Sequence, residues 1–358
     1  MSCRASGPGW IRLWVVLAAS AAVVLAGCGS PATEAPNPPS GQVPSGAQPA
    51  DGPPAPTLSG EVSDDAAMVH LRALQKIADD HGGNRASGTP GYEASVDYVV
   101  GALRRAGFEV STPAYEISEE DAEDGRAGTF RNVVAQTRTG DPGRVVMIGA
   151  HLDSVPEGPG IVDNGSGVAS LLEIAARLGA SPSVRNAVRF AFFGHEETGA
   201  QGSTGYVTGL SDAERAQLML YLNVDMVASP NAGYFAQGGL GDDTSTAGPT
   251  GSASVGRVLA DQLARTGVKP EMIEFVGDDE SGFIEAGIPV GGAENGDSKR
   301  KTTAQANAWG GQAGQVYDRC YHQACDRIEN VNQVVLGHYL RALAGTVGHF
   351  ATSNETLR

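Results

Sequence analysis

Apolar residues recur at helical spacing where the globular part of the chain begins. They fall three or four positions apart, at Met68, Leu71, Leu74 and Ile77. This spacing places them on one face of a helix, and the pair Gly82-Gly83 ends the pattern because glycine is a poor helix former. A second helix is predicted over residues 92–106, and Gly107 stops it.

Short apolar runs of strand length follow these two helices. They cover residues 132–136, 145–149, 188–193 and 218–224. Helical patterns lie between several of them, for example over residues 166–178. This alternation is typical of an α/β fold, and we expect a mixed, mostly parallel central sheet sandwiched by helices. Such sheets bind ligands outside the carboxyl ends of their strands.

The first 27 residues have the pattern of a cleaved targeting segment. Arg4 and Arg12 make the N-terminal region positively charged, and the apolar run over residues 13–25 is short for a transmembrane helix. The next residues, Leu25-Ala26-Gly27-Cys28, resemble the bacterial lipobox, in which the cysteine becomes the lipidated N-terminus. We expect a lipoprotein signal peptide, acylation of Cys28 with chains such as palmitate, and a cell-membrane location facing outside the cytoplasm. The alternative is an ordinary secretory signal with a chance cysteine.

A proline-rich segment separates the lipobox from the globular pattern. Residues 29–58 hold nine prolines among alanine, glycine and serine, a composition that cannot bury a core. We therefore divide the chain into a signal peptide (1–27), a lipidated cysteine with its tether (28–60) and one globular catalytic domain (61–358). We expect a monomer that meets the membrane only through its anchor.

Composition and charge limit the kinds of function that this chain can have. The 358 residues include 41% hydrophobic ones and carry a net charge of −16. An acidic protein is a poor candidate for nucleic-acid binding, and its field favours cationic ligands. Of the four cysteines, Cys3 is removed with the signal and Cys28 carries lipid. Cys320 and Cys325 remain, and we expect them to form a disulfide in an oxidising compartment.

Histidine and acidic residues follow three of the predicted strands. They are His151, Glu196, Glu197 and Asp225, and Asp163 lies in a glycine-rich stretch just before a predicted helix. Packed carboxylates are costly unless cations neutralise them, and imidazole with carboxylate suits zinc. The set holds more acids than one ion needs, which indicates two metal ions that share a carboxylate.

Two common hydrolase patterns are incomplete in this chain. His195-Glu196-Glu197 begins like the zincin motif, but the position four residues after the histidine is Gly199. No Gly-x-Ser-x-Gly elbow follows a predicted strand, so serine hydrolase chemistry lacks support. A single aspartate after a strand is most often a cap or turn residue, and only the whole set indicates a site.

Five ordered motifs closely resemble those of the secreted bacterial double-zinc leucyl aminopeptidases. They are Gly149-Ala150-His151-Leu152-Asp153-Ser154-Val155, Gly160-Ile161-Val162-Asp163-Asn164-Gly165-Ser166-Gly167, Glu196-Glu197-Thr198-Gly199, Leu222-Asn223-Val224-Asp225-Met226 and Cys320-Tyr321-His322-Gln323-Ala324-Cys325-Asp326. The resemblance runs from about residue 66 to about residue 348. It implies the zinc-peptidase (aminopeptidase) fold, removal of single residues from peptide N-termini, and two zinc ions per chain. No large insertion separates the motifs, so a protease-associated domain is not expected.

The resemblance also implies a metal ligand set. His151 and Asp225 would hold one zinc ion, Glu197 and His322 would hold the other, and Asp163 would bridge both.

Further roles are implied for residues beside these ligands. Glu196 would be the general base, Tyr321 would donate a hydrogen bond to the oxyanion of the tetrahedral intermediate, and Asp153 would orient a ligand imidazole. A disulfide between Cys320 and Cys325 would fix the loop that carries Tyr321; the alternative is that it only stabilises a surface turn.

The chain departs from the family pattern at two places. The relatives have an Arg-Ser-Asp-His-x-Pro-Phe block where this sequence has an acidic run, Asp278-Asp279-Glu280. After Gly291-Gly292 the relatives place an apolar and aromatic pair in the first substrate pocket, and here Ala293-Glu294 follows. We expect Asp278 and Glu294 to favour a lysine or arginine side chain in that pocket; the alternative is that these acids point to solvent.

Three other functions stay open at this point. A carboxypeptidase of the same fold would need a basic cluster for the terminal carboxylate, and the sequence offers acids instead. A glutaminyl cyclase uses a related fold with one zinc ion, against which the five-ligand set argues. A non-catalytic envelope lipoprotein would be indicated by loss of Glu196 or Tyr321, and both residues are present.

Overall fold

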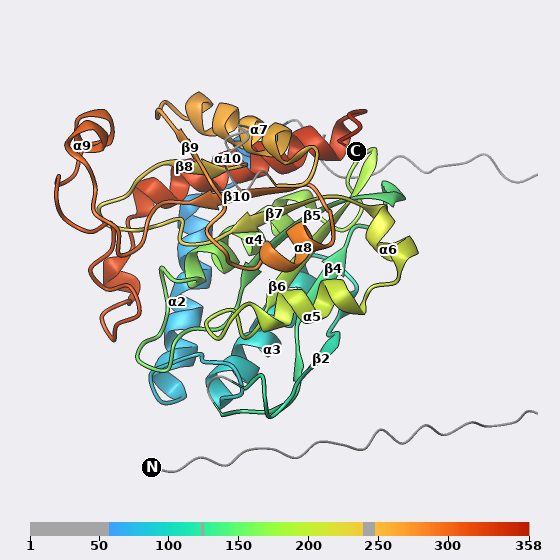
Figure 1. Cartoon of the computed structure of the whole chain (residues 1–358), viewed down its shortest axis with the longest axis horizontal. Coiled ribbons are helices and arrows are strands. Elements are labelled where there is room, and N and C mark those ends of the chain that lie inside the picture. The colour runs from blue at the N-terminus through green and yellow to red at the C-terminus, as the bar shows by residue number, and fades with distance from the viewer. Residues whose placement is uncertain (1–56, 123–124, 239–247, 358) are drawn as a thin grey trace, which may run out of the picture. The chain divides into compact units, whose positions relative to one another are not determined.

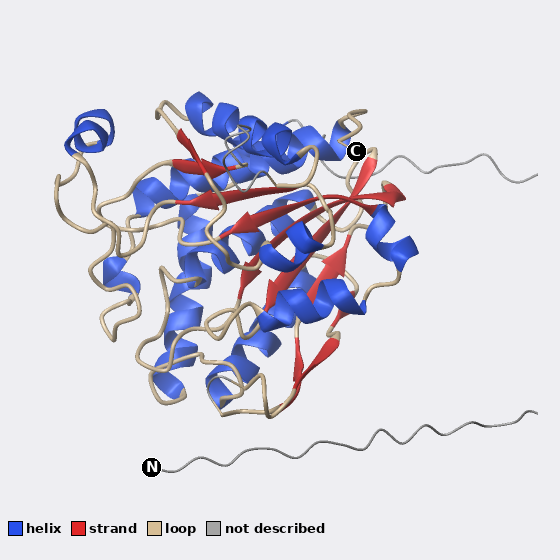
Figure 2. Cartoon of the chain, in the orientation of Figure 1, coloured by secondary structure: helices blue, strands red, loops and turns tan. Residues whose placement is uncertain are grey.

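An eight-stranded sheet forms the centre of the protein (Figures 1 and 2). The computed structural model describes residues 57–122, 125–238 and 248–357. The predicted signal peptide, Cys28 and nearly all of the predicted tether lie outside the described residues. The strands of the sheet are β1 (Val110–Ser111), β4 (Val133–Gln136), β5 (Asp141–His151), β6 (Asn186–Phe193), β7 (Leu218–Val224), β8 (Phe235–Gln237), β9 (Glu271–Ile273) and β10 (Val290–Glu294).

The strand order is β1-β4-β6-β5-β7-β10-β8-β9. The middle strands β6, β5, β7 and β10 pair in parallel, as do β8 and β9, whereas β1–β4, β4–β6 and β8–β10 pair antiparallel. This confirms the predicted mixed, mostly parallel sheet. Because β5, β7 and β10 run in the same direction, the residues at their carboxyl ends meet at one edge. A separate hairpin of β2 (Ala114–Ile117) and β3 (Gly128–Arg131) lies outside this sheet.

Helices cover both faces of the sheet (Figure 2). One face carries α2 (Asp64–Asp80), α3 (Pro90–Arg105), α4 (Gly165–Leu178), α7 (Ser252–Arg265) and α10 (Gln333–Thr352), which bury their apolar sides in the larger core. The other face carries α5 (Gln201–Gly209) and α8 (Ser281–Glu285), which pack in a smaller core. The remaining helices are α1 (Leu58–Glu61), α6 (Asp212–Gln217), α9 (Thr303–Trp309) and a 3-10 turn, Ile328–Asn330.

Local sequence explains where the first long helices begin. The side chain of Ser63 accepts the N–H of Ala66 at the start of α2, and Thr89 caps α3 with Pro90 in its first turn. Caps of this kind stabilise a helix by about 1 kcal/mol each, and proline suits the first turn. Thus α3 begins two residues before the predicted range, because Pro90 belongs inside the helix.

The start of α4 brings two distant segments together. The side chain of Asn164 accepts the N–H of Gly167 and donates to the carbonyl of Val224, the last residue of β7. A Cβ atom on Gly167 would lie 2.8 Å from that carbonyl oxygen, so only glycine allows this approach. The contact places Asp163, directly before the cap, beside the carboxyl end of β7.

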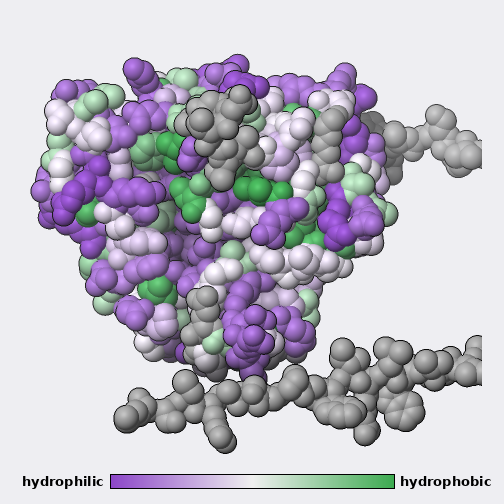
Figure 3. All heavy atoms as spheres, viewed as in Figure 1, coloured by the Kyte–Doolittle hydropathy of each residue, from purple (hydrophilic) through white to green (hydrophobic). Residues whose placement is uncertain are grey.

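The described surface is mainly polar. Hydrophilic side chains predominate on the face viewed in Figure 3, and hydrophobic ones form small separate groups. The large hydrophobic residues that are well exposed in the described ranges are Val69, Val276 and Val334. Within those ranges, no helix has both the length and the apolar character needed to cross a bilayer.

Candidate metal centre and active site

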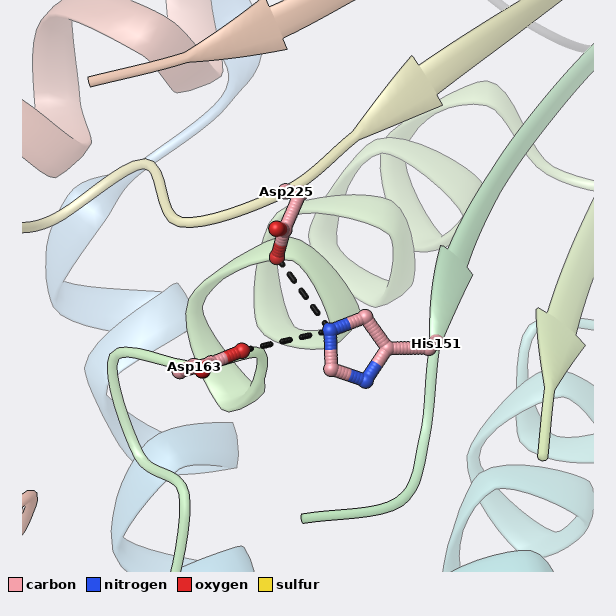
Figure 4. A group of neighbouring side chains, drawn as sticks. All are labelled: His151, Asp163 and Asp225. Carbon is pink, nitrogen blue, oxygen red and sulfur yellow. Dashed lines mark hydrogen bonds and ion pairs between the residues drawn. The ribbon is translucent and has the colours of Figure 1, made fainter. Parts of the chain in front are cut away.

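Three of the predicted ligands meet at the carboxyl edge of the sheet (Figure 4). His151 is the last residue of β5, and Asp225 directly follows β7. The Nε2 atom of His151 lies 3.2 Å from Oδ1 of Asp163 and 3.3 Å from Oδ1 of Asp225. His151 and Asp163 are almost fully buried. The sequence placed His151 after its strand; β5 is longer than predicted and includes it.

A second group forms around the other oxygen of Asp163. The Nε2 atom of His322 lies 3.3 Å from Oδ2 of Asp163 and 3.0 Å from Oε2 of Glu197. Asp163 therefore directs one carboxylate oxygen toward each histidine. In each group the potential donor atoms lie within 4.8 Å of one another, a spacing that lets them surround one ion.

The chemistry of both groups fits zinc. Each group offers one imidazole nitrogen and carboxylate oxygens, the ligand types that zinc binds in proteins. Oε1 of Glu197 is buried without a hydrogen-bond partner, and a buried carboxylate oxygen normally has one. A cation at this position would satisfy that oxygen.

The ionisation of the same residues shows how much negative charge is gathered here. Burial, together with the charge of the nearby Asp163, raises the pKa of Glu197 to about 8. Burial alone would lower the pKa of His322, but hydrogen bonds to Asp163 and Glu197 raise it to about 10. Burial would also lower the pKa of His151, but its acidic neighbours outweigh burial and raise that pKa well above its usual value. The two imidazoles therefore balance part of the negative charge of these carboxylates.

Glu196 lies beside the first group and is held by Asp153. Its Oε2 is 3.8 Å from Nε2 of His151, and its backbone N–H donates to Oδ1 of Asp153 at 3.3 Å. The same Oδ1 is 3.5 Å from Nδ1 of His151, which is too long for a good hydrogen bond. Burial raises the pKa of Glu196 well above its usual value, against the opposing charge of His151.

Tyr321 and His322 lie in a loop closed by the predicted disulfide. Cys320 and Cys325 are bonded, with 5.2 Å between their Cα atoms, which confirms the pairing. The rings of Tyr321 and His322 stack with centroids 3.8 Å apart. Burial raises the pKa of Tyr321 well above its usual value, and the charge of Asp163 adds to this, so its hydroxyl keeps its proton.

Asp326 is a positioning residue to which the sequence assigned no role. Its Oδ1 and Oδ2 accept the backbone N–H groups of Val162 and Asp163 at 2.9 and 3.0 Å. The carboxylate is 2% exposed and joins the disulfide loop to the loop that carries Asp163. Its place directly after Cys325 in a matching motif is the feature that could have identified it.

Arg85 is a second residue whose role the sequence did not reveal. Its guanidinium is fully buried and donates to the carbonyls of Leu152, Pro159 and Gly160. These carbonyls belong to the segment between His151 and Asp163. Arg85 thus fixes that segment and also places a positive charge among the acids of the site.

The acidic residues that depart from the family pattern are buried. Asp279, Glu280 and Glu294 are 1%, 0% and 5% exposed, and Asp278 is half-buried. Glu294 ends β10, where Ala293 pairs with Val224 beside Asp225, and it accepts a hydrogen bond from Gln237 at 3.1 Å. Burial raises the pKa of Glu294 to about 7, and the charge of Asp225 contributes.

Backbone strain is concentrated at the same loops. His195, Met226 and His322 have φ values of 54°, 46° and 56°, in the left-handed region that costs a non-glycine residue about 1 kcal/mol. Each of these three is a predicted ligand or lies within two residues of one, and the fourth described non-glycine residue of this kind, Ala200, follows Glu197 by three positions. Such strain persists only where the surrounding contacts fix it.

Comparisons with known proteins identify the family of this chain. The model of peptidase family M28 matches residues 132–347. Leupeptin-inactivating enzyme 1 of Streptomyces exfoliatus is 43% identical over 77% of this chain, which spans 59% of that enzyme's length. The probable lipoprotein aminopeptidase LpqL of Mycobacterium tuberculosis is 34% identical over 82% of this chain and 86% of its own length.

Solved structures share the fold at low sequence identity. A zinc aminopeptidase from Bacillus subtilis superimposes with a TM-score of 0.65 and 16% identity, covering 83% of this chain and 99% of that one. Glutaminyl cyclase from Porphyromonas gingivalis superimposes with a TM-score of 0.60 and 23% identity, covering 81% and 98%. These likenesses confirm the predicted fold and do not separate the two activities.

Proposed function

This chain belongs to peptidase family M28, and from that premise we propose that it is a zinc-dependent aminopeptidase. The observation that carries the proposal is the position of Asp163, whose two carboxylate oxygens lie 3.2 and 3.3 Å from the Nε2 atoms of His151 and His322. One carboxylate between two imidazoles can serve as a ligand shared by two metal ions. The aminopeptidase names of several relatives support the choice of substrate.

The two groups of side chains would hold two zinc ions. His151 and Asp225 would bind the first ion, Glu197 and His322 the second, and Asp163 both. Bound zinc would activate a water molecule for attack and polarise the carbonyl of the scissile bond.

Glu196 would be the general base of the reaction. It lies 3.8 Å from His151 and is not one of the proposed ligands, so its carboxylate is free to take the proton of the attacking water. It would then pass that proton to the nitrogen of the departing peptide. Asp153 fixes the backbone of Glu196 and lies next to His151, so it would orient both residues.

Tyr321 would stabilise the oxyanion that develops when the peptide carbonyl is attacked. Its hydroxyl remains protonated and so can donate a hydrogen bond. The Cys320–Cys325 disulfide and the contacts of Asp326 hold the loop of Tyr321 and His322 against the Asp163 loop. We favour a catalytic role for this crosslink over stabilisation of a surface turn alone.

We further propose that the first substrate pocket prefers lysine or arginine. Glu294, Asp279 and Glu280 are buried, and Asp278 is half-buried, so none of these acids is fully exposed to solvent. Burial raises the pKa of Asp278, and the charges of Asp225 and Glu196 raise it as well, which supports a position of this residue near the proposed metal centre. A basic side chain would give the carboxylates a charged partner.

The proposed location is the outer side of the cell membrane, through lipid on Cys28. The residues concerned lie outside the described part of the chain, so the domain limits at residues 27 and 60 remain predictions. The relative LpqL is named as a probable lipoprotein aminopeptidase, which supports this location.

One assay separates the proposed activity from its alternatives. Purified protein is given a peptide with a free N-terminus and the same peptide N-acetylated, with and without a chelator. We expect release of the N-terminal amino acid from the free peptide only, its loss with chelator, its recovery with zinc, and about two zinc ions per chain. Release of the C-terminal residue would indicate a carboxypeptidase, pyroglutamate formation a glutaminyl cyclase, and full activity with one zinc ion per chain would contradict the two-metal site.

A further inference from the structure

His195 binds a hairpin that lies outside the central sheet. Its Nδ1 is 2.7 Å from the hydroxyl oxygen of Tyr115 in β2, within hydrogen-bond distance. Its ring packs edge-on against Phe130 of β3, with centroids 4.2 Å apart. The side chain is fully buried. His195 immediately precedes Glu196 and Glu197. The residue that contacts the hairpin is therefore the sequence neighbour of the proposed catalytic base.

The main chain of His195 is fixed in an unusual conformation. Its φ of 54° turns the chain sharply two residues after the end of β6. Its N–H donates to Oγ of Ser87 at 2.8 Å, and its carbonyl accepts the N–H of Gln201 at 2.9 Å. The direction in which Glu196 and Glu197 leave the strand therefore depends on this single residue.

The hydroxyl of Tyr115 also contacts the backbone of the same loop. A Cβ atom added to Gly194 would lie 2.6 Å from it, so Tyr115 touches the loop on both sides of the Gly194–His195 peptide. The next residue, Glu196, donates its backbone N–H to the carboxylate of Asp153. Its carbonyl accepts the N–H groups of Gly199 and Ala200. The hairpin thus supports this turn through His195, and Asp153 supports it separately at the N–H of Glu196.

We propose that His195, together with Tyr115, is a positioning residue that sets the placement of the Glu196 and Glu197 carboxylates. The inference rests on the proposed function for the role of those two glutamates. A ligand role for His195 is a different idea, and the geometry opposes it: its ring packs against both Tyr115 and Phe130, and neither group of potential ligands in the described residues includes it. The competing explanation is simple core packing.

The fold contains a matched control for this pair. Nδ1 of His70 is likewise 2.7 Å from the hydroxyl oxygen of Tyr98, and those rings meet edge-on with centroids 5.9 Å apart. The Tyr115–His195 centroids are 5.8 Å apart in the same arrangement. His70 and Tyr98 lie on α2 and α3, away from the glutamates in sequence and outside the two ligand groups.

The experiment compares Tyr115→Phe and His195→Asn with Tyr98→Phe in the full-length protein. Asparagine tolerates the left-handed backbone, so His195→Asn removes the ring without adding backbone strain. The measurements are kcat and KM for peptide hydrolysis, the melting temperature, and the visible absorption spectrum after loading with Co²⁺, which reports ligand geometry without requiring turnover.

We expect Tyr115→Phe and His195→Asn to lower kcat about tenfold with KM within about twofold, or to alter the Co²⁺ spectrum, while Tyr98→Phe changes neither. The proposal is overturned if kcat and the Co²⁺ spectrum of both variants stay as in the unsubstituted protein. It is also overturned if Tyr98→Phe changes kcat and the spectrum equally. If the unsubstituted protein hydrolyses no peptide, the proposed function fails, and the Co²⁺ spectra alone decide the positioning role. Melting temperatures separate misplacement from unfolding, and Tyr115→Phe, which removes one oxygen atom, remains informative if His195→Asn does not fold.

Discussion

The carboxylate of Asp326 accepts the backbone N–H of Asp163, with 3.0 Å between Oδ2 and the nitrogen. Asp326 directly follows the disulfide cysteine Cys325, whereas Asp163 supplies an oxygen to each of the two histidine groups. The bond therefore ties the position of the central carboxylate to the loop that carries His322. A change at Asp326 should reach the metal centre without altering a ligand.

Asp326→Asn should weaken both folding and metal binding. The new amide must place its NH₂ group opposite Val162 or Asp163, whose N–H groups now donate to the two oxygens. One buried donor then lacks an acceptor, which costs about 1–3 kcal/mol. Urea unfolding and zinc titration measure the two effects. Asp79→Asn is the control, because Asp79 is exposed and its partners, Arg327 and Gln75, belong to neither ligand group; equal losses in both variants would contradict the argument.

Glu196→Gln should separate turnover from metal retention. The substitution keeps the size of the side chain and removes the proton acceptor, so kcat should fall at least about 10²-fold. Zinc content should stay the same, because Glu196 is not one of the proposed ligands. Glu197→Gln is the matched comparison and should lose zinc as well. Activity near that of the unsubstituted protein would show that another group is the base.

The strand-end part of the site was predictable from sequence for a physical reason. His151, Glu196 and Asp225 come at the ends of strongly apolar runs, and parallel strands in one sheet bring such ends together. His322 follows no apolar run, so only the family resemblance assigned it. Its place depends on the disulfide and on Asp326, contacts between residues far apart in the chain.

Other parts of the fold had no clear local pattern. Strand β10 contains Gly291 and Gly292, residues that favour no strand, and it exists because β7 and β8 pair with it on both sides. The β2–β3 hairpin alternates buried and exposed residues over only four positions in β2. Arg85 looks like a surface residue in the sequence, and its burial follows from three loop carbonyls that no local pattern reveals.

His70 should make the stability of the protein depend on pH below neutrality. Burial lowers its pKa to about 4, with a further contribution from Arg105, whereas an unfolded histidine titrates near 6.5. Between these values the unfolded chain binds more protons, so the free energy of unfolding falls as the pH drops from about 7 to 4. The contribution of His70 is up to about 3 kcal/mol.

Urea unfolding of the unsubstituted protein and of His70→Gln at several pH values measures the contribution of His70 to the free energy of unfolding. The difference between the two curves removes the contributions of all other titrating groups. We expect that difference to change over the pH range 4 to 6.5. Parallel curves for His70→Gln would show that His70 does not titrate with the lowered pKa.

Cys28→Ala should move the protein from the membrane fraction to the soluble fraction. Each buried CH₂ of an acyl chain contributes roughly 0.8 kcal/mol to membrane binding, and this variant carries no such chain. Cys3→Ala is the control, because Cys3 lies in the predicted signal peptide, and it should stay in the membrane fraction. Membrane association that persists in Cys28→Ala would contradict lipid anchoring at this residue.

Glu294 should control the choice of the first substrate residue. It is 5% exposed at the end of β10, beside Asp225, with Gln237 as a neutral hydrogen-bond partner. Facing a leucine side chain, the carboxylate would stay without a charged partner, at a cost of roughly 1–3 kcal/mol. A lysine or arginine side chain would supply that partner. We therefore expect kcat/KM to be higher for Arg- and Lys-anilides than for the Leu-anilide.

Two substitutions at this position test the reason for that preference. Glu294→Gln should lower the Arg-to-Leu ratio of kcat/KM about tenfold, since a factor of ten corresponds to about 1.4 kcal/mol, and Glu294→Phe should reverse the preference toward leucine. Glu285→Gln removes one charge from the exposed end of α8 and should leave the ratio unchanged, which separates a pocket contact from the general negative field. If leucine is strongly preferred by the unsubstituted protein, or if Glu294→Phe does not alter the ranking, Glu294 does not contact the substrate side chain.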